Sequence, residues 1–221
     1  MTIATDYMAA TLVFNLRMLP ETLFVGVIIL AVLLANQSLV ILGIGAGLLQ
    51  LLTSTVGTLI MKYAPQSAVL TTGLDMCSTG FLGRTWNKVL RGQEAPELLW
   101  HPIAPSIFMA TIGYFYGYGL ALLQIYKEEI DAKVVPRSTL IATAIIGTLI
   151  VVAAFLSRYW GSCETILGAT GGLLFGLAFS YLGAITLAAA TDRRATNVWG
   201  IPLLKDRIND GSPLYICPAD Q

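Results

Sequence analysis

Long apolar runs separated by short polar segments dominate the chain. Charged side chains are absent from residues 22–61, 102–126, 138–156 and 165–191. A helix that crosses a bilayer needs about 20 mostly apolar residues, and a charge at its centre costs about 2.5–3.5 kcal/mol on insertion. This pattern predicts several membrane-spanning helices.

The first run is too long for a single span. Asn36, Gln37 and Ser38 interrupt it with polar groups that lipid would leave unsatisfied. We therefore expect a tight helical hairpin, followed by the other runs. The expected fold is an all-α, polytopic transmembrane helical bundle of five spans, or four if the first run lies partly in the interface. The five expected spans cover residues 19–35, 39–60, 102–126, 138–156 and 165–191.

Two segments outside the expected spans are rich in groups that can pack. Residues 62–101 contain several prolines and glycines between apolar residues, so we expect an ordered loop. In the tail, residues 192–221, Asn209-Asp210-Gly211-Ser212 is a turn signal between two short extended pieces. The expected organisation is a transmembrane bundle over residues 1–191 and a folded tail over residues 192–221.

Composition agrees with a membrane protein. Of the 221 residues, 56% are apolar and 12% are charged, whereas an average soluble domain is about 45–50% apolar and about 25% charged. Thirteen basic and thirteen acidic residues give a net charge of +0. Binding to nucleic acid needs a basic face that neutralises phosphates, so we expect no nucleic-acid partner.

The cysteines and the single histidine limit the chemistry. Cys77, Cys163 and Cys217 lack metal-ligand spacing, and His101 is the only histidine. We expect no metal and no cofactor. Two spans separate Cys77 from Cys163, which places both on one side of the membrane. They would form a disulfide if that side is oxidising, and three free thiols are the alternative.

Glycines recur at helical spacing. Residues four apart share one helix face, and small residues there let two backbones approach closely. We expect a compact bundle, packed through Gly43, Gly47, Gly113, Gly117, Gly168, Gly172 and Gly176. Three tyrosines, Tyr114, Tyr116 and Tyr118, surround one glycine pair. Aromatic packing is the favoured interpretation of these tyrosines, and a polar cavity is the alternative.

Three short pieces resemble motifs of the type 2 phosphatidic acid phosphatase superfamily, whose members show Lys-x6-Arg-Pro, Pro-Ser-Gly-His and Ser-Arg-x5-His-x3-Asp. In this chain the lysine and proline of the first motif match as Lys88 and Pro96. Pro105-Ser106 matches the start of the second motif. Ser157-Arg158 matches the start of the third, with Glu164 and Gly168 where its histidine and aspartate would fall.

The residues that differ from these motifs are the ones that would carry out the reaction. Family members attack phosphorus with the third-motif histidine and protonate the leaving group with the second-motif histidine; neither histidine is present here. The resemblance therefore implies no catalytic residue, and at most a lipid-phosphate binding site in which Lys88 and Arg158 hold an anionic headgroup. Arg158 and Glu164 flank a short connection and would be able to pair with each other.

A second resemblance is to small multi-span proteins carried in the membrane beneath the capsid of large DNA viruses. It is based on Cys163-Glu164-Thr165 before a glycine-rich run, and on the tail segment Asp210-Gly211-Ser212-Pro213-Leu214-Tyr215-Ile216-Cys217. The resemblance implies a structural role and a viral inner membrane.

We therefore expect a non-catalytic, structural integral membrane protein that anchors or seals a larger assembly. Its expected partners are membrane lipids and other protein chains, which would contact the loop 62–101 and the tail 192–221. The alternatives are a lipid-phosphate binding protein or phosphatase with a degenerate site, and a supernumerary subunit of an organellar membrane complex.

Overall fold

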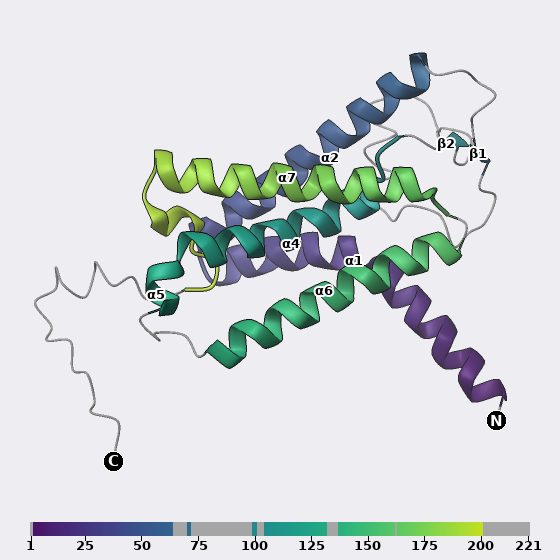
Figure 1. Cartoon of the computed structure of the whole chain (residues 1–221), viewed down its shortest axis with the longest axis horizontal. Helices are drawn as coiled ribbons and strands as arrows, with labels where there is room; N and C mark the ends of the chain where they lie inside the picture. Colours follow the sequence, from purple (N-terminus) through teal and green to yellow (C-terminus); the bar gives the residue numbers. More distant parts are fainter. Residues whose placement is uncertain are drawn as a thin grey trace, which may run out of the picture.

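A computed structural model describes residues 2–63, 70–71, 99–100, 104–131, 137–161 and 163–200. In chain order the elements are α1 (Thr2–Leu33), α2 (Gln37–Tyr63), β1 (Leu70–Thr71), β2 (Leu99–Trp100), α4 (Ile107–Ile125), α5 (Lys127–Asp131), α6 (Arg137–Trp160), α7 (Ile166–Ala190) and the 3-10 turn η3 (Arg193–Thr196). The two short strands pair antiparallel, with Leu70 opposite Trp100. The rest is a bundle of long helices (Figure 1), which confirms the predicted all-α class.

Four helical segments are long and apolar enough to cross a membrane: Gln37–Ile60, Ile107–Ile125, Ser138–Trp160 and Ile166–Ala190. They match the four later spans expected from the sequence. The segment expected as the first span is the apolar part of α1, Met18–Leu33, which is shorter than the others. By length and composition the described residues therefore give four candidate spans, the lower of the two expected counts.

A tight turn joins α1 to α2, as the polar interruption predicts. Ala35 adopts a left-handed backbone conformation, with a φ of 47°. The side-chain oxygen of Asn36 accepts a hydrogen bond of 2.9 Å from the backbone N–H of Ser38. This bond satisfies one of the free N–H groups in the first turn of α2. The polar residues within the long apolar run thus form the helix–helix connection.

Helix α4 lies at the centre of the bundle and α7 packs along it (Figure 1), with the outer face of α7 left exposed. Gly113 and Gly117 of α4 face the α7 backbone: a Cβ added there would meet the carbonyl oxygens of Leu173 and Leu177. Gly176 of α7 faces the carbonyl of Ala110 in the same way. Only hydrogen fits at these points, so the two backbones lie in direct contact.

The other glycines singled out by spacing lie in different surroundings. Gly172 faces the backbone of Ser106 just before α4, and the Gly168 carbonyl accepts a 3.0 Å hydrogen bond from the Ser106 N–H. Gly43 and Gly47 of α2 face α1, where an added Cβ would lie 3.6 Å and 4.0 Å from its side chains. Those are ordinary contact distances, so the α1–α2 packing does not depend on glycine.

Helix α6 packs at the edge of the bundle. Only 6% of the apolar stretch of α6 is buried inside the bundle, compared with 61% for α4. Its apolar residues Ile146 and Leu149 are exposed by 57% and 62%. Most of the surface of α6 is therefore free to face lipid or another chain.

We expect Gly176→Ala to destabilise the bundle, because the added methyl group meets the Ala110 carbonyl and neither backbone can move aside cheaply. Overpacking of this kind costs about 1–3 kcal/mol. Gly183→Ala on the same helix is the matched control, since nothing lies within 4 Å of its added Cβ. Thermal unfolding in detergent measures both variants. Equal midpoints for the two would show that the α4–α7 contact is not close.

Candidate functional site

A buried ion pair lies where α6 ends and α7 begins. Arg158 is 5% exposed, and its Nε and one terminal nitrogen donate to Oε1 of Glu164 at 3.0 Å and 2.8 Å. The guanidinium carbon lies 4.7 Å from the centre of the Phe108 ring, in a cation–π arrangement. The pairing of Arg158 with Glu164 that the sequence suggested is thus present.

The helix starts beside this pair are capped by side chains. The Ser106 hydroxyl accepts from the Met109 N–H at 3.0 Å and begins α4, and Thr165 accepts from the Gly168 N–H at 3.1 Å and begins α7. Ser106 is buried, and its own N–H binds Gly168 across the two helices. We call this group of Ser106, Arg158, Glu164 and Thr165 the Arg158 end of the bundle.

The Arg158 end brings together the pieces that resemble the second and third phosphatase motifs. Ser106, Arg158, Glu164 and Gly168 come together there, but in a closely packed arrangement in which Glu164 already neutralises Arg158. Oε2 of Glu164 is buried and has no hydrogen-bond partner within the described residues. Lys88 and His101 lie outside the described residues, so the structure gives no Lys88–Arg158 distance.

Cys163 is next to this ion pair and is disulfide-bonded. The prediction of three free thiols is therefore wrong. The other two cysteines, Cys77 and Cys217, lie outside the described residues. Among the residues that the structure describes, no three His, Cys, Asp or Glu side chains gather in a cluster that would hold a metal ion.

The opposite end of the bundle holds the start of the tail. The turn η3 follows α7 and packs against α2, and Thr196 is completely buried there. Ser38 donates to the Arg194 carbonyl at 2.8 Å, and Tyr118 donates to the Thr196 carbonyl at 3.2 Å. We call this region the η3 end. The predicted folded tail is seen only in residues 192–200, and its predicted turn near Asn209 lies outside the described residues.

Tyr126 is the central residue of the η3 end. Its hydroxyl donates to the Arg193 carbonyl at 2.5 Å and lies 3.3 Å from the Thr196 hydroxyl. Burial raises the pKa of the Tyr126 phenol above its ordinary value, with a smaller raising effect from the Glu129 carboxylate. The hydroxyl therefore stays protonated at neutral pH and keeps its bond to the tail.

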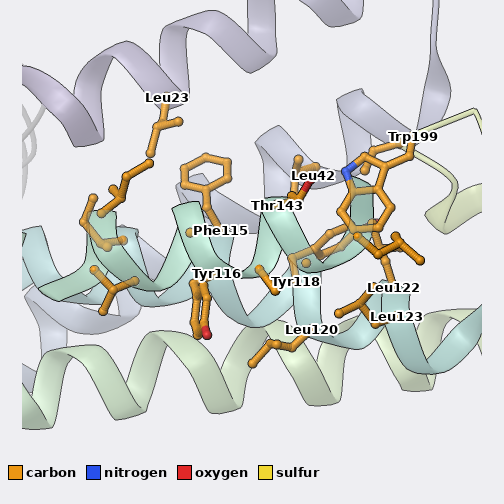
Figure 2. Close-up of a pocket in the computed structure, with 18 residues that line it drawn as sticks. Leu23, Leu42, Phe115, Tyr116, Tyr118, Leu120, Leu122, Leu123, Thr143 and Trp199 are labelled. Atoms are coloured by element: carbon orange, nitrogen blue, oxygen red, sulfur yellow. The ribbon is translucent and has the colours of Figure 1, made fainter. Parts of the chain in front are cut away.

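A pocket of about 290 Å³ lies between α4 and α6. Its lining comes from α1, α2, α4, α6 and the start of the tail; the residues are Leu23, Leu42, Ile112, Phe115, Tyr116, Tyr118, Gly119, Leu120, Leu122, Leu123, Leu140, Thr143, Ala144, Gly147, Ile150, Val151, Val198 and Trp199. Figure 2 shows Leu23 at one end and Trp199 at the other. We call it the α4–α6 groove, and none of the residues at the Arg158 end lines it.

Sequence reasoning singled out the tyrosines of α4 but missed their contacts. Tyr114 donates to the Leu42 carbonyl at 3.0 Å and packs edge-on against Phe115, while its hydroxyl presses against Gly45, a glycine outside the predicted set. Aromatic packing, the favoured interpretation, describes Tyr114. Tyr116 and Tyr118 line the groove. No sequence period marks the groove itself, although three of its lining residues are small: Gly119 of α4, and Ala144 and Gly147 of α6.

We expect Glu164→Ala to destabilise the protein by about 3–5 kcal/mol, because it leaves the buried Arg158 charge without a partner. Arg194→Ala is the control: the Asp192–Arg194 pair has side chains 66% and 63% exposed, and such pairs contribute about 0–1 kcal/mol. Chemical unfolding in detergent measures both. Replacing both partners with apolar residues, Arg158→Met with Glu164→Leu, should recover most of the loss. A small loss in Glu164→Ala alone would mean that water reaches Arg158.

We expect Tyr126→Phe to loosen η3, because the Arg193 carbonyl and Thr196 hydroxyl lose a partner. Hydrogen exchange of residues 191–200 should become about 2- to 10-fold faster, since one such bond contributes about 0.5–1.5 kcal/mol. Tyr63→Phe, at a tyrosine that is 78% exposed, should leave this exchange unchanged. Unchanged exchange in Tyr126→Phe would show that other contacts hold the tail.

Comparison of the chain with protein-family models, with curated proteins and with solved structures gives no match. The two resemblances seen in the sequence therefore stay predictions, and the proposals below are based on the geometry of the chain itself.

Proposed function

We propose that this membrane protein is a non-catalytic structural component that anchors or seals a larger assembly. The observation that carries the proposal is that the buried polar side chains bond to other parts of the chain. Ser38, Tyr114, Tyr118 and Tyr126 each donate to a backbone carbonyl of a distant segment, and Arg158 binds Glu164. These bonds fix helices and tail to one another, as expected of a rigid scaffold.

Two further features support a scaffold. The α4–α7 contact leaves no space for either backbone to slide, so the centre of the bundle is rigid. Helix α6 exposes most of its apolar surface, and within a membrane this surface is able to pack against a neighbouring chain as well as against lipid. The loop 62–101 and the tail 192–221 are the proposed docking surfaces outside the membrane.

The assembly we favour is a viral capsid with its inner membrane. This choice is based on the resemblance carried by Cys163-Glu164-Thr165 and by residues 210–217. A supernumerary subunit of an organellar membrane complex shares the same physical requirements. The lipid-phosphate alternative requires Arg158 to leave Glu164 and bind a headgroup, at the cost of exposing a buried carboxylate.

The native size of the protein tests the proposal. After extraction from its own source in mild detergent, we expect the chain to migrate with a much larger particle, with the loop 62–101 and the tail 192–221 shielded from protease. Detergent-dissociated chain, cut at both segments, is the control. A free species of 23.7 kDa, or a small oligomer with an accessible tail, would contradict the proposal. Hydrolysis of phosphatidic acid that is lost in Arg158→Ala would support the phosphatase alternative.

A further inference from the structure

The α4–α6 groove is long and narrow. On α4 its lining extends from Ile112 to Leu123, eleven residue steps that correspond to about 16 Å along the helix. It therefore follows the direction of the spanning helices and ends near Ile125, where α4 leaves the expected membrane region. Trp199 lies at this end (Figure 2), the depth at which tryptophan is enriched at the surface of a bilayer.

The hydroxyl groups in the groove wall are already bonded to the protein. Tyr118 donates to the Thr196 carbonyl, Thr143 donates to the Thr139 carbonyl at 2.8 Å, and the Tyr116 hydroxyl lies 2.9 Å from that of Thr148. Nearly all other lining groups are hydrocarbon. An occupant thus finds dispersion contacts along the wall but few polar partners, which selects an apolar chain.

The groove is open along its side. Most of its lining residues are half-buried, and Thr143, Ile150 and Trp199 are exposed. Its volume of about 290 Å³ is spread over about 16 Å of α4, which leaves a narrow cross-section along the helix. A single hydrocarbon chain, entering from the surrounding lipid, matches this narrow apolar shape.

We propose that the α4–α6 groove binds one acyl chain of a membrane phospholipid, which lies along α4 with its headgroup end beside Trp199. The bound chain fills the space that separates α6 from α4 and holds the otherwise exposed helix against the bundle. It is a specific lipid site, distinct from the lipid that surrounds the outer faces of the helices.

Gly119 offers a direct test, because it lines the groove and nothing lies within 4 Å of an added Cβ. Gly119→Leu fills the groove with a side chain of the protein. Gly183→Leu is the matched control: it makes the same exchange within a helix, its added Cβ also meets nothing, and it lies outside the groove. Ala144→Leu fills the groove from α6 and serves as a second variant if Gly119→Leu does not fold.

The probe is phosphatidylcholine with a photoreactive diazirine on one acyl chain, added to bilayers that contain the full chain. After irradiation we expect labelled residues on the facing walls of α4 and α6, and about a tenfold loss of this label in Gly119→Leu and in Ala144→Leu. Gly183→Leu should be labelled like the wild type. Circular dichroism and elution volume confirm that each compared variant is folded.

Two outcomes would overturn the proposal. Equal labelling of the groove walls in folded Gly119→Leu and in the wild type would show that the lipid does not occupy the groove. An equal loss in Gly119→Leu and Gly183→Leu would show that the label reports only the lipid surrounding the bundle. Because the readout is a bound lipid and not the size of a particle, it is independent of the proposed scaffold function.

Discussion

The contact between the backbones of α4 and α7 is the constraint on which the rest of the structure depends. Side chains are missing where the helices cross, at Gly113, Gly117 and Gly176, so carbonyl groups of one helix lie directly against the other. Lipid tails are as apolar as the helices, so burial of apolar surface does not drive helices together in a membrane. Close van der Waals contact does, and it is strongest where no side chain intervenes.

The two ends of this pair are fixed by polar bonds. At the Arg158 end, capped helix starts and a neutralised ion pair connect α4, α6 and α7. At the η3 end, Tyr118, Tyr126 and Ser38 hold the backbone of the tail. Between the two ends, dispersion contacts act together with the hydrogen bonds of Tyr114 and Tyr116. The result is a bundle in which the buried polar groups hold the fold together.

Helix α6 is the exception to this close packing. Its last turns are connected to the Arg158 end, and Tyr116 contacts it through Thr148 and Gly147, while the α4–α6 groove lies between the two helices beside this contact. A scaffold with a rigid centre and one loosely packed outer helix is able to meet lipid or neighbouring chains without disturbing its core. The proposed docking of other chains and the proposed lipid binding therefore both use surfaces outside the closely packed core.

Local features of the sequence determined much of this fold. Uninterrupted apolar runs predicted the helices of the bundle, Asn36 predicted a turn, and Arg158 and Glu164 were within reach across a six-residue separation. Glycines four residues apart marked the faces of α4 and α7 that pack closely, although the same spacing in α2 did not mark a close contact. These features depend on neighbours along the chain, which a sequence displays directly.

Only the tertiary structure decided which helices meet. The spacing of the glycines did not predict that α4 pairs with α7, because a repeat within one helix carries no information about which helix packs against it. Tyr118 and Thr196 are 78 residues apart, and the α4–α6 groove is formed by four helices and the tail. Such sites arise where side chains from distant segments leave a cavity between them or form hydrogen bonds with one another. Both depend on the packing of the whole bundle.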